Sequence, residues 1–134
     1  PALLCDYGKH GCIETFISGT GLSRQNAISI GEQFSAEKIM ARTEKSDTLS
    51  ISSMGRYESC VARAFAPIIN VIDPDFIVLG GGTANVTRLY ENIKAKWSDL
   101  VFSTGVTTKL RLPWFGDSSG VCGAAWLWPE GVAL

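Results

Sequence analysis

The sequence has little of several features that would assign it to a particular class of protein. It has one histidine, and its 12 basic and 13 acidic residues give a net charge of -1. No apolar run approaches the ~18 residues of a membrane helix, and the first residues lack the charged-then-apolar pattern of a signal peptide. A chain without a basic excess is not expected to bind nucleic acid. We therefore expect a cytoplasmic protein with neither membrane nor nucleic acid as a partner.

Cysteine is also sparse, with four residues in 134. This number is too low and too dispersed for the disulfide framework of a short secreted domain. Cys60 and Cys122 lie within apolar helical patterns, which predicts small buried thiols. Cys5 and Cys12 belong instead to the segment CDYGKHGCIE, which also contains the only histidine, two glycines and Glu14.

The chemistry of this segment is open from the residues alone. Cys5 and Cys12 are separated by six residues, which is wider than the paired spacing of most zinc sites, and His10 would add only a third ligand. Glu14 opens a short helix, where a carboxylate is favoured by the helix dipole. Glu14 can therefore have either of two roles. It can stabilise the start of the helix, or it can accept hydrogen bonds from sugar hydroxyls.

The length and composition of the chain are those of a single domain with a hydrophobic core, since 46% of its 134 residues are hydrophobic and 19% are charged. Helical and strand patterns alternate in its second half, which indicates an α/β fold. We predict helices over about 13–18, 24–30, 36–45, 47–71, 86–100 and 118–128, with strands over 76–79 and 107–112. Glycines 19 and 21 are predicted to close the first helix, and Pro129 the last.

The clearest element is the long helix over 47–71. Pro67 lies inside it and is expected to kink or weaken it, and the DPD segment at 73–75 is expected to end it. The apolar face predicted for this helix consists of Met54, Tyr57, Val61, Phe65, Ile68 and Ile72. The all-apolar run over 76–79 that follows predicts a buried strand.

Three glycines, Gly80, Gly81 and Gly82, follow that strand directly. Ligands of α/β folds bind at the carboxyl ends of strands, and glycines allow a ligand to pack against bare backbone. The start of the following helix favours phosphate. No Gly-Lys-Ser or Gly-Lys-Thr follows, so the segment is not a P-loop. A glycine-rich turn without a ligand remains the alternative.

Three segments together resemble the C-terminal half of the ROK (repressor, open reading frame, kinase) sugar kinases. They are GCIETFISGTG at 11–21, NVIDPDFIVLGGG at 70–82 and GDSSGVCGAAWLW at 116–128. The chain is most similar to bacterial fructokinases of the manno(fructo)kinase type. The resemblance implies a lobe of the actin-like ATPase (ribonuclease H-like) fold, and residues 1–134 would form one C-terminal lobe without its N-terminal partner.

The resemblance also implies an activity and the residues for it. The parent enzyme would transfer the γ-phosphoryl group of ATP, with Mg²⁺, to a hydroxyl of a hexose of the fructose or mannose class. Glu14 would bind sugar hydroxyls, and Gly80, Gly81 and Gly82 would line the adenosine site. The small residues Gly123, Ala124 and Ala125 would let a helix pack closely at the hinge between lobes.

The family's zinc motif is incomplete here. Cys5 and Cys12 match its first and last cysteines, whereas Tyr7 stands at the middle cysteine and the upstream histidine is not in the chain. Two of four expected ligands are therefore missing, and a phenol is a poor substitute for a thiolate. Whether Zn²⁺ binds is left open by the resemblance, and His10 is not expected to replace a ligand.

No catalytic residue is expected in the chain itself. The family's catalytic aspartate and phosphate loops precede the segment that this chain resembles, and Asp73, Asp75 and Asp117 fit turn or cap positions. We therefore expect the chain alone to be inactive. Two alternatives to a kinase lobe are a non-catalytic lobe that binds sugar or nucleotide or dimerises, and a piece of a ROK transcriptional repressor. Four tryptophans and the large apolar share predict a homodimer.

Overall fold

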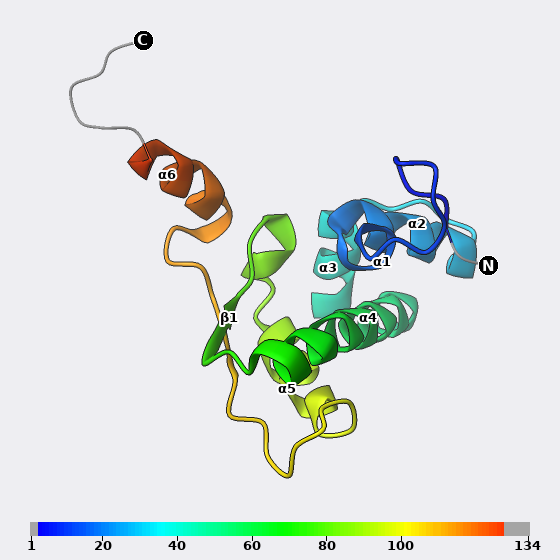
Figure 1. The fold of residues 1–134 in the computed structure, drawn as a ribbon. Helices are drawn as coiled ribbons and strands as arrows, with labels where there is room; N and C mark the ends of the chain where they lie inside the picture. Colours follow the sequence, from blue (N-terminus) through cyan, green and yellow to red (C-terminus); the bar gives the residue numbers. More distant parts are fainter. Residues whose placement is uncertain (1–2, 128–134) are drawn as a thin grey trace.

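A computed structural model of the chain describes residues 3–127. Six α-helices, two strands and two 3₁₀ helices follow one another in this part of the chain (Figure 1). They are α1 (Glu14–Ile17), α2 (Gly19–Ile30), α3 (Ala36–Glu44), α4 (Thr48–Ile72), β1 (Phe76–Val78), η1 (Gly82–Asn85), α5 (Arg88–Trp97), β2 (Lys109–Arg111), η2 (Gly116–Ser118) and α6 (Ser119–Trp126). The predicted α/β class is confirmed. The predicted end of the last helix, at Trp128 and Pro129, lies outside the described residues.

Polar side chains fix where α3 and α4 begin. The Ser35 hydroxyl accepts a hydrogen bond of 3.3 Å from the backbone N–H of Lys38, and the Asp47 carboxylate accepts one of 2.9 Å from the N–H of Ser50. Both are N-cap bonds, which satisfy backbone donors that have no partner within the helix. The predicted starts of these helices are therefore confirmed.

The prediction that Gly19 and Gly21 end the first helix is wrong. A second helix, α2, begins at Gly19, because Ser18 caps it by accepting a bond of 2.9 Å from the N–H of Gly21. A Cβ atom at Gly21 would lie 2.6 Å from the carbonyl oxygen of Thr15. Gly21 is thus required for the close packing of α2 on α1 and does not terminate a helix.

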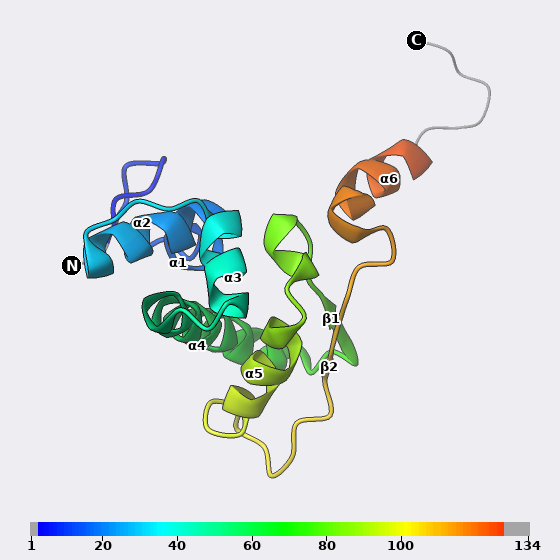
Figure 2. The ribbon, with the colours of Figure 1, turned by 180° about the vertical axis from the view of Figure 1, so that it is seen from behind.

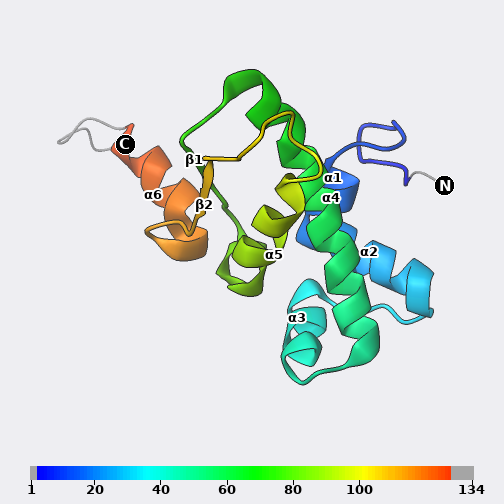
Figure 3. The ribbon, with the colours of Figure 1, turned by 90° about the horizontal axis from the view of Figure 1, so that it is seen from below.

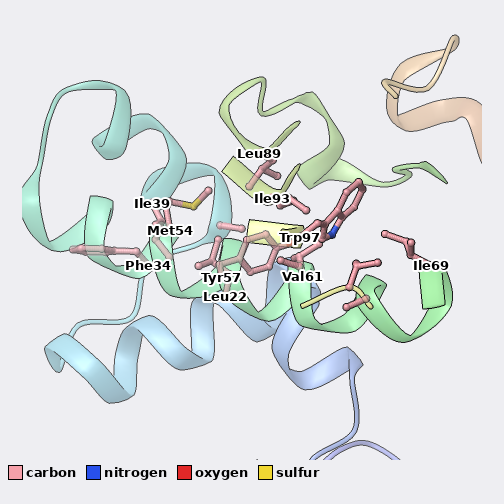
Figure 4. Close-up of a cluster of buried hydrophobic side chains, with 14 residues drawn as sticks. Leu22, Phe34, Ile39, Met54, Tyr57, Val61, Ile69, Leu89, Ile93 and Trp97 are labelled. Carbon is pink, nitrogen blue, oxygen red and sulfur yellow. The ribbon is translucent and has the colours of Figure 1, made fainter. Parts of the chain in front are cut away.

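Helix α4 is the centre of the fold and lies between α2 on one side and α5 on the other (Figure 3). Figure 4 shows its buried side chains, among them Tyr57 and Val61, against Leu22 of α2 and Trp97 of α5. The helix continues through Pro67 and ends at Ile72, where Asp73 adopts a left-handed φ of 48°. The DPD segment therefore ends the helix as predicted.

The predicted apolar face of α4 is wrong by one position in its C-terminal part. Ile68 and Ile72 are 42% and 67% exposed, whereas Ile69 is 3% exposed. A helix has 3.6 residues per turn, so the step that keeps the core face after Phe65 is four residues and not three. The core face thus passes through Ala66 and Ile69.

A buried ion pair holds α5 against α4. The Glu58 side chain is 3% exposed and accepts hydrogen bonds from Arg88 at 2.7 Å and from Asn92 at 3.0 Å. A carboxylate at such depth is tolerated only when it is paired and hydrogen-bonded. With both partners on α5, this contact also sets the position of α5 along α4.

Strands β1 and β2 pair in parallel, with Ile77 opposite Leu110. These two residues pack on the core, whereas Phe76 and Val78 are 56% and 60% exposed. The prediction of a fully buried strand is therefore wrong. The sheet of the described residues has two strands and only one face covered by the helices, so alternate side chains of the apolar run remain outside.

Helix α6 stands apart from the other helices, beyond the extended segment that contains β2 (Figure 1 and, from behind, Figure 2). It follows η2 directly and begins at Ser119, one residue after the start predicted at about 118. Cys60 on α4 and Cys122 on α6 are both only partly buried, which corrects the prediction of buried thiols. Within residues 3–127, no helix is both long and apolar enough to cross a membrane.

The contact of Gly21 can be tested with two matched glycine variants. Gly21→Ala places a methyl group against the Thr15 carbonyl and is expected to lower the free energy of unfolding by about 1–3 kcal/mol. Gly55→Ala, inside α4 with nothing within 4 Å, is expected to raise it by about 0.5–1 kcal/mol. Chemical denaturation measures both. Equal effects of the two substitutions would contradict the packing role.

Candidate sugar and nucleotide pocket

An open pocket of about 930 Å³ joins two parts of the chain that are far apart in the sequence. Glu14 of α1 lies on one wall, and Gly80, Gly81 and Gly82 lie on another. The first residues of α2 and α3 complete the lining. The structure therefore brings together the predicted sugar-binding residue and the predicted nucleotide-binding glycines.

Glu14 lies in the first turn of α1 and is exposed. The turn that contains Glu14 is fixed by Thr15, whose hydroxyl donates a hydrogen bond of 2.6 Å to the Cys12 carbonyl. At the end of α1, the Ser18 hydroxyl donates one of 2.7 Å to the Glu14 carbonyl. The backbone of Glu14 is thus held from both sides, and the residue itself is exposed and lines the pocket.

The glycine segment has the exposed backbone that was expected of it. A Cβ atom at Gly80, Gly81 or Gly82 would meet nothing within 4 Å, so packing does not require glycine at these positions. Only Gly81 needs it for conformation, with a φ of 82°. The absent side chains leave room in the pocket. The predicted helix start at 86 is corrected, because the 3₁₀ helix η1 begins at Gly82 and α5 begins only at Arg88.

Tyr57 of α4 contacts both walls of the pocket through its hydroxyl. Its hydroxyl donates a hydrogen bond of 2.6 Å to the carbonyl of Ile17, at the end of α1, and lies 3.3 Å from the hydroxyl of Thr83, next to the glycines. The residue is 3% exposed, and burial raises the pKa of its hydroxyl, which stays protonated as a donor. Sequence analysis assigned Tyr57 to the core face only.

Further polar groups that sequence analysis missed line the pocket. The hydroxyls of Ser18 and Thr20 lie 2.9 Å apart, and Arg24 and Glu37 add one charge of each sign. A backbone N–H and the hydroxyl of Ser35 lower the pKa of Glu37, which therefore stays ionised near neutral pH. The walls thus offer several hydrogen-bonding groups, as a polar ligand requires.

The segment 5–12 forms a tight turn held by its own backbone. The N–H of Cys5 bonds to the carbonyl of Lys9 at 2.8 Å, and the N–H of Gly8 bonds to the carbonyl of Cys5 at 2.9 Å. Gly8 and Gly11 have positive φ angles, of 73° and 76°, which glycine adopts readily. The Cys12 thiol donates to the sulfur of Cys5 at 2.9 Å, which lowers the pKa of Cys5 and raises the pKa of Cys12.

The residues of this turn do not fit a four-ligand zinc site. Two thiolates on one tetrahedral zinc ion lie about 3.8 Å apart, given Zn–S bonds of about 2.3 Å, whereas the two sulfurs here are 2.9 Å apart. Tyr7, at the position of the family's middle cysteine, is 89% exposed. Among residues 3–127, no three His, Cys, Asp or Glu side chains are grouped so that they could hold a metal ion.

The remaining predicted residues lie outside the pocket. A Cβ atom at Gly123 would meet nothing within 4 Å, and α6 buries no residue, so close packing of Gly123, Ala124 and Ala125 stays a prediction. Asp73 caps α4, and the Asp75 carbonyl accepts a bond of 2.9 Å from the N–H of Lys109. The side chain of Asp117 is not described. Among the described residues, no aspartate lines the pocket.

Comparison with known proteins identifies the family and the fold of this chain. The ROK family model matches residues 1–131, and the chain therefore belongs to the ROK family. In fold, the chain is similar to a ROK family glucokinase from Streptomyces griseus in complex with glucose and AMPPNP. The TM-score is 0.83 at 22% identity, and the match covers 97% of this chain and 48% of that one. The expected ROK relationship and fold class are thus confirmed.

Curated relatives are more similar in sequence. The N-acetyl-D-glucosamine kinases of Erwinia tasmaniensis and Aliivibrio fischeri are each 32% identical to this chain over 127 residues, which is 95% of its length. The chain spans 42% of the length of each. A ROK family transcriptional regulator, a homologue of the E. coli MLC protein, also shares the fold, with a TM-score of 0.70 at 23% identity over 83% of this chain and 31% of that one.

The link between the two walls can be tested with Tyr57→Phe. The substitution leaves the ring in place but removes the donor to the Ile17 carbonyl, and we expect a loss of about 1–2 kcal/mol in the free energy of unfolding. Tyr7→Phe, at a residue that is 89% exposed, is the matched control and is expected to change nothing measurable. Urea titrations that give the two variants the same midpoint would show that the bond does not stabilise the fold.

Proposed function

We propose that this chain is the C-terminal lobe of an ATP-dependent sugar kinase. In this proposal, the pocket binds a hexose near Glu14 and the nucleotide near Gly80, Gly81 and Gly82. The observation that carries it is that residues 66 positions apart line one pocket with a bare glycine backbone on one side and a carboxylate on the other. Membership of the ROK family, whose relatives include named sugar kinases, supports the same activity.

The chemistry of the pocket supports sugar binding at the end with Glu14 and nucleotide binding at the end with the glycines. A carboxylate accepts hydrogen bonds from two sugar hydroxyls, and such charge-assisted bonds are stronger than neutral ones. An unhindered glycine backbone allows a flat adenosine group to lie close to the chain. In kinases Mg²⁺ arrives largely on the nucleotide phosphates, so a carboxylate cage in this lobe is not required.

The catalytic base is proposed to lie on a part of the kinase outside these 134 residues. Among the described residues no aspartate lines the pocket, and phosphoryl transfer requires a positioned base and phosphate clamps. Isolated residues 1–134 are therefore proposed to bind ligands without turning them over.

The preferred hexose is proposed to be of the fructose or mannose class, on the three segments that resemble fructokinases. Named relatives point to other sugars as well, since the curated ones are N-acetyl-D-glucosamine kinases and the S. griseus protein is a glucokinase with bound glucose. The substrate panel of any test must therefore include fructose, mannose, glucose and N-acetylglucosamine.

A pair of substitutions tests the two ends of the pocket separately. Glu14→Gln removes the charge of the sugar-binding carboxylate and is expected to weaken sugar binding about tenfold or more, a loss of at least about 1.4 kcal/mol. Gly80→Val places a side chain where nothing lies within 4 Å and is expected to weaken AMPPNP binding by a similar factor. Calorimetric titration of the chain with the sugar panel and with AMPPNP measures both.

The matched controls are Glu91→Gln and Gly105→Val. Glu91 also lies in the first turn of a helix, and Gly105 also has open space around it, but neither lines the pocket. Each pocket variant should spare the other ligand and both controls should bind normally. Equal losses of binding in all four variants would reject the assignment of the two ends of the pocket. If the isolated chain released ADP from ATP in the presence of sugar, the proposal that the catalytic base lies outside residues 1–134 would be rejected.

A sugar-responsive transcriptional repressor is the second candidate, because the chain shares its fold with a ROK transcriptional regulator. Such a protein would bind the hexose and DNA without consuming ATP. The pocket would then respond to sugar alone, and AMPPNP would not bind. The titration described above therefore also separates a kinase from a repressor.

The homodimer stays a prediction, and the exposed aromatic side chains support it. Phe102, Trp114 and Trp126 are 96%, 92% and 76% exposed, which is unusual for side chains of this size in a monomer. Light scattering of the purified chain across a wide concentration range is expected to give a dimer mass. A monomer mass at every concentration would contradict the prediction.

A further inference from the structure

The two thiols that do not fit a zinc site are arranged for a different chemistry. The sulfurs of Cys5 and Cys12 are 2.9 Å apart, and an S–S bond is about 2.05 Å long. They therefore need to approach by only about 0.9 Å to become bonded. We propose that Cys5 and Cys12 form a reversible disulfide, so that this turn is a thiol–disulfide site and not a metal site.

The turn around the two cysteines is already closed by bonds that do not involve sulfur. Gly8 donates to the Cys5 carbonyl at 2.9 Å, Cys5 donates to the Lys9 carbonyl at 2.8 Å, and Leu4 and His10 form an antiparallel bridge. These contacts hold both ends of the segment in place without a metal. The segment that brings the two sulfurs to 2.9 Å is thus held by its own backbone.

The two thiols differ in access, which sets the order of events. Cys5 is 7% exposed, whereas Cys12 is only partly buried. Attack on an external disulfide needs an accessible thiolate. The hydrogen bond from Cys12 makes Cys5 the more acidic thiol, but Cys5 is buried, so access decides the order. Cys12 thus reacts first, and Cys5 acts as the resolving thiol.

The proposed oxidant is a small-molecule disulfide such as oxidised glutathione. Cys12 loses its proton to solvent, and its thiolate attacks one sulfur of the oxidant; this forms a mixed disulfide and releases one glutathione thiolate, which takes up a proton from solvent. Cys5 then loses its proton to solvent and attacks the Cys12 sulfur, which displaces the second glutathione. The protein loses two electrons and two protons, and the oxidant is reduced to two thiols.

The link would reach the pocket through the backbone of Cys12. The Cys12 carbonyl accepts bonds from the N–H of Thr15 at 3.0 Å and from its hydroxyl at 2.6 Å, and Glu14 lies within this turn. A disulfide would therefore fix the position of Cys12, whose carbonyl holds the first turn of α1 with Glu14. Disulfides in reducing compartments are usually of this transient kind.

The test uses the chain with Cys60→Ser and Cys122→Ser, which leaves only the proposed pair. It is incubated with a metal chelator and excess oxidised glutathione, then digested with trypsin without reduction. Trypsin cleaves after Lys9 and Arg24, so the disulfide joins the peptides 1–9 and 10–24. We expect this linked product, an intact mass lower by about 2 Da, and full reversal by dithiothreitol.

Single variants test the order of attack. Cys5→Ser is expected to stop at one stable glutathione adduct on Cys12, and Cys12→Ser is expected to react more slowly because Cys5 is 7% exposed. Two glutathione adducts on the chain with both cysteines, or no reaction in excess oxidant, would overturn the proposal. Mass spectrometry reads each outcome without any need for kinase activity or a bound ligand.

Discussion

The hydroxyl of Tyr57 joins the two walls of the pocket, and much of the architecture serves to hold it in place. It donates to the end of α1 on one side and lies against Thr83 on the other. The position of Tyr57 depends on α4, which the Glu58 carboxylate ties to Arg88 and Asn92 of α5. The wall with Glu14 and the wall with the three glycines are thus both held by contacts to α4.

Local patterns in the sequence predicted several helix boundaries of this fold. The starts of α3 and α4 follow from Ser35 and Asp47, and the end of α4 follows from the DPD segment, because caps and proline act within a few residues. The resemblance to the ROK family predicted that Glu14 and the three glycines belong to one protein function. Family membership is now shown, and the two elements line one pocket.

Long-range contacts could not be predicted in the same way. Gly21 has the appearance of a helix terminator in sequence, and only the approach of the Thr15 carbonyl reveals its packing role. Tyr57 has the spacing of a core residue, and its partner Ile17 lies 40 residues earlier. The exposure of Phe76 and Val78 depends on how many strands and helices cover the sheet, which a four-residue apolar run does not encode.

The two-stranded sheet has a consequence for how the chain behaves in solution. Each strand is paired on one side only, and its other edge has no neighbouring strand among the described residues. The backbone N–H and C=O groups on such edges can accept an additional strand from another chain. Contacts between copies can therefore arise by sheet extension as well as by burial of aromatic side chains. Sheet extension would build an open, growing assembly, whereas a patch of side chains favours a closed pair.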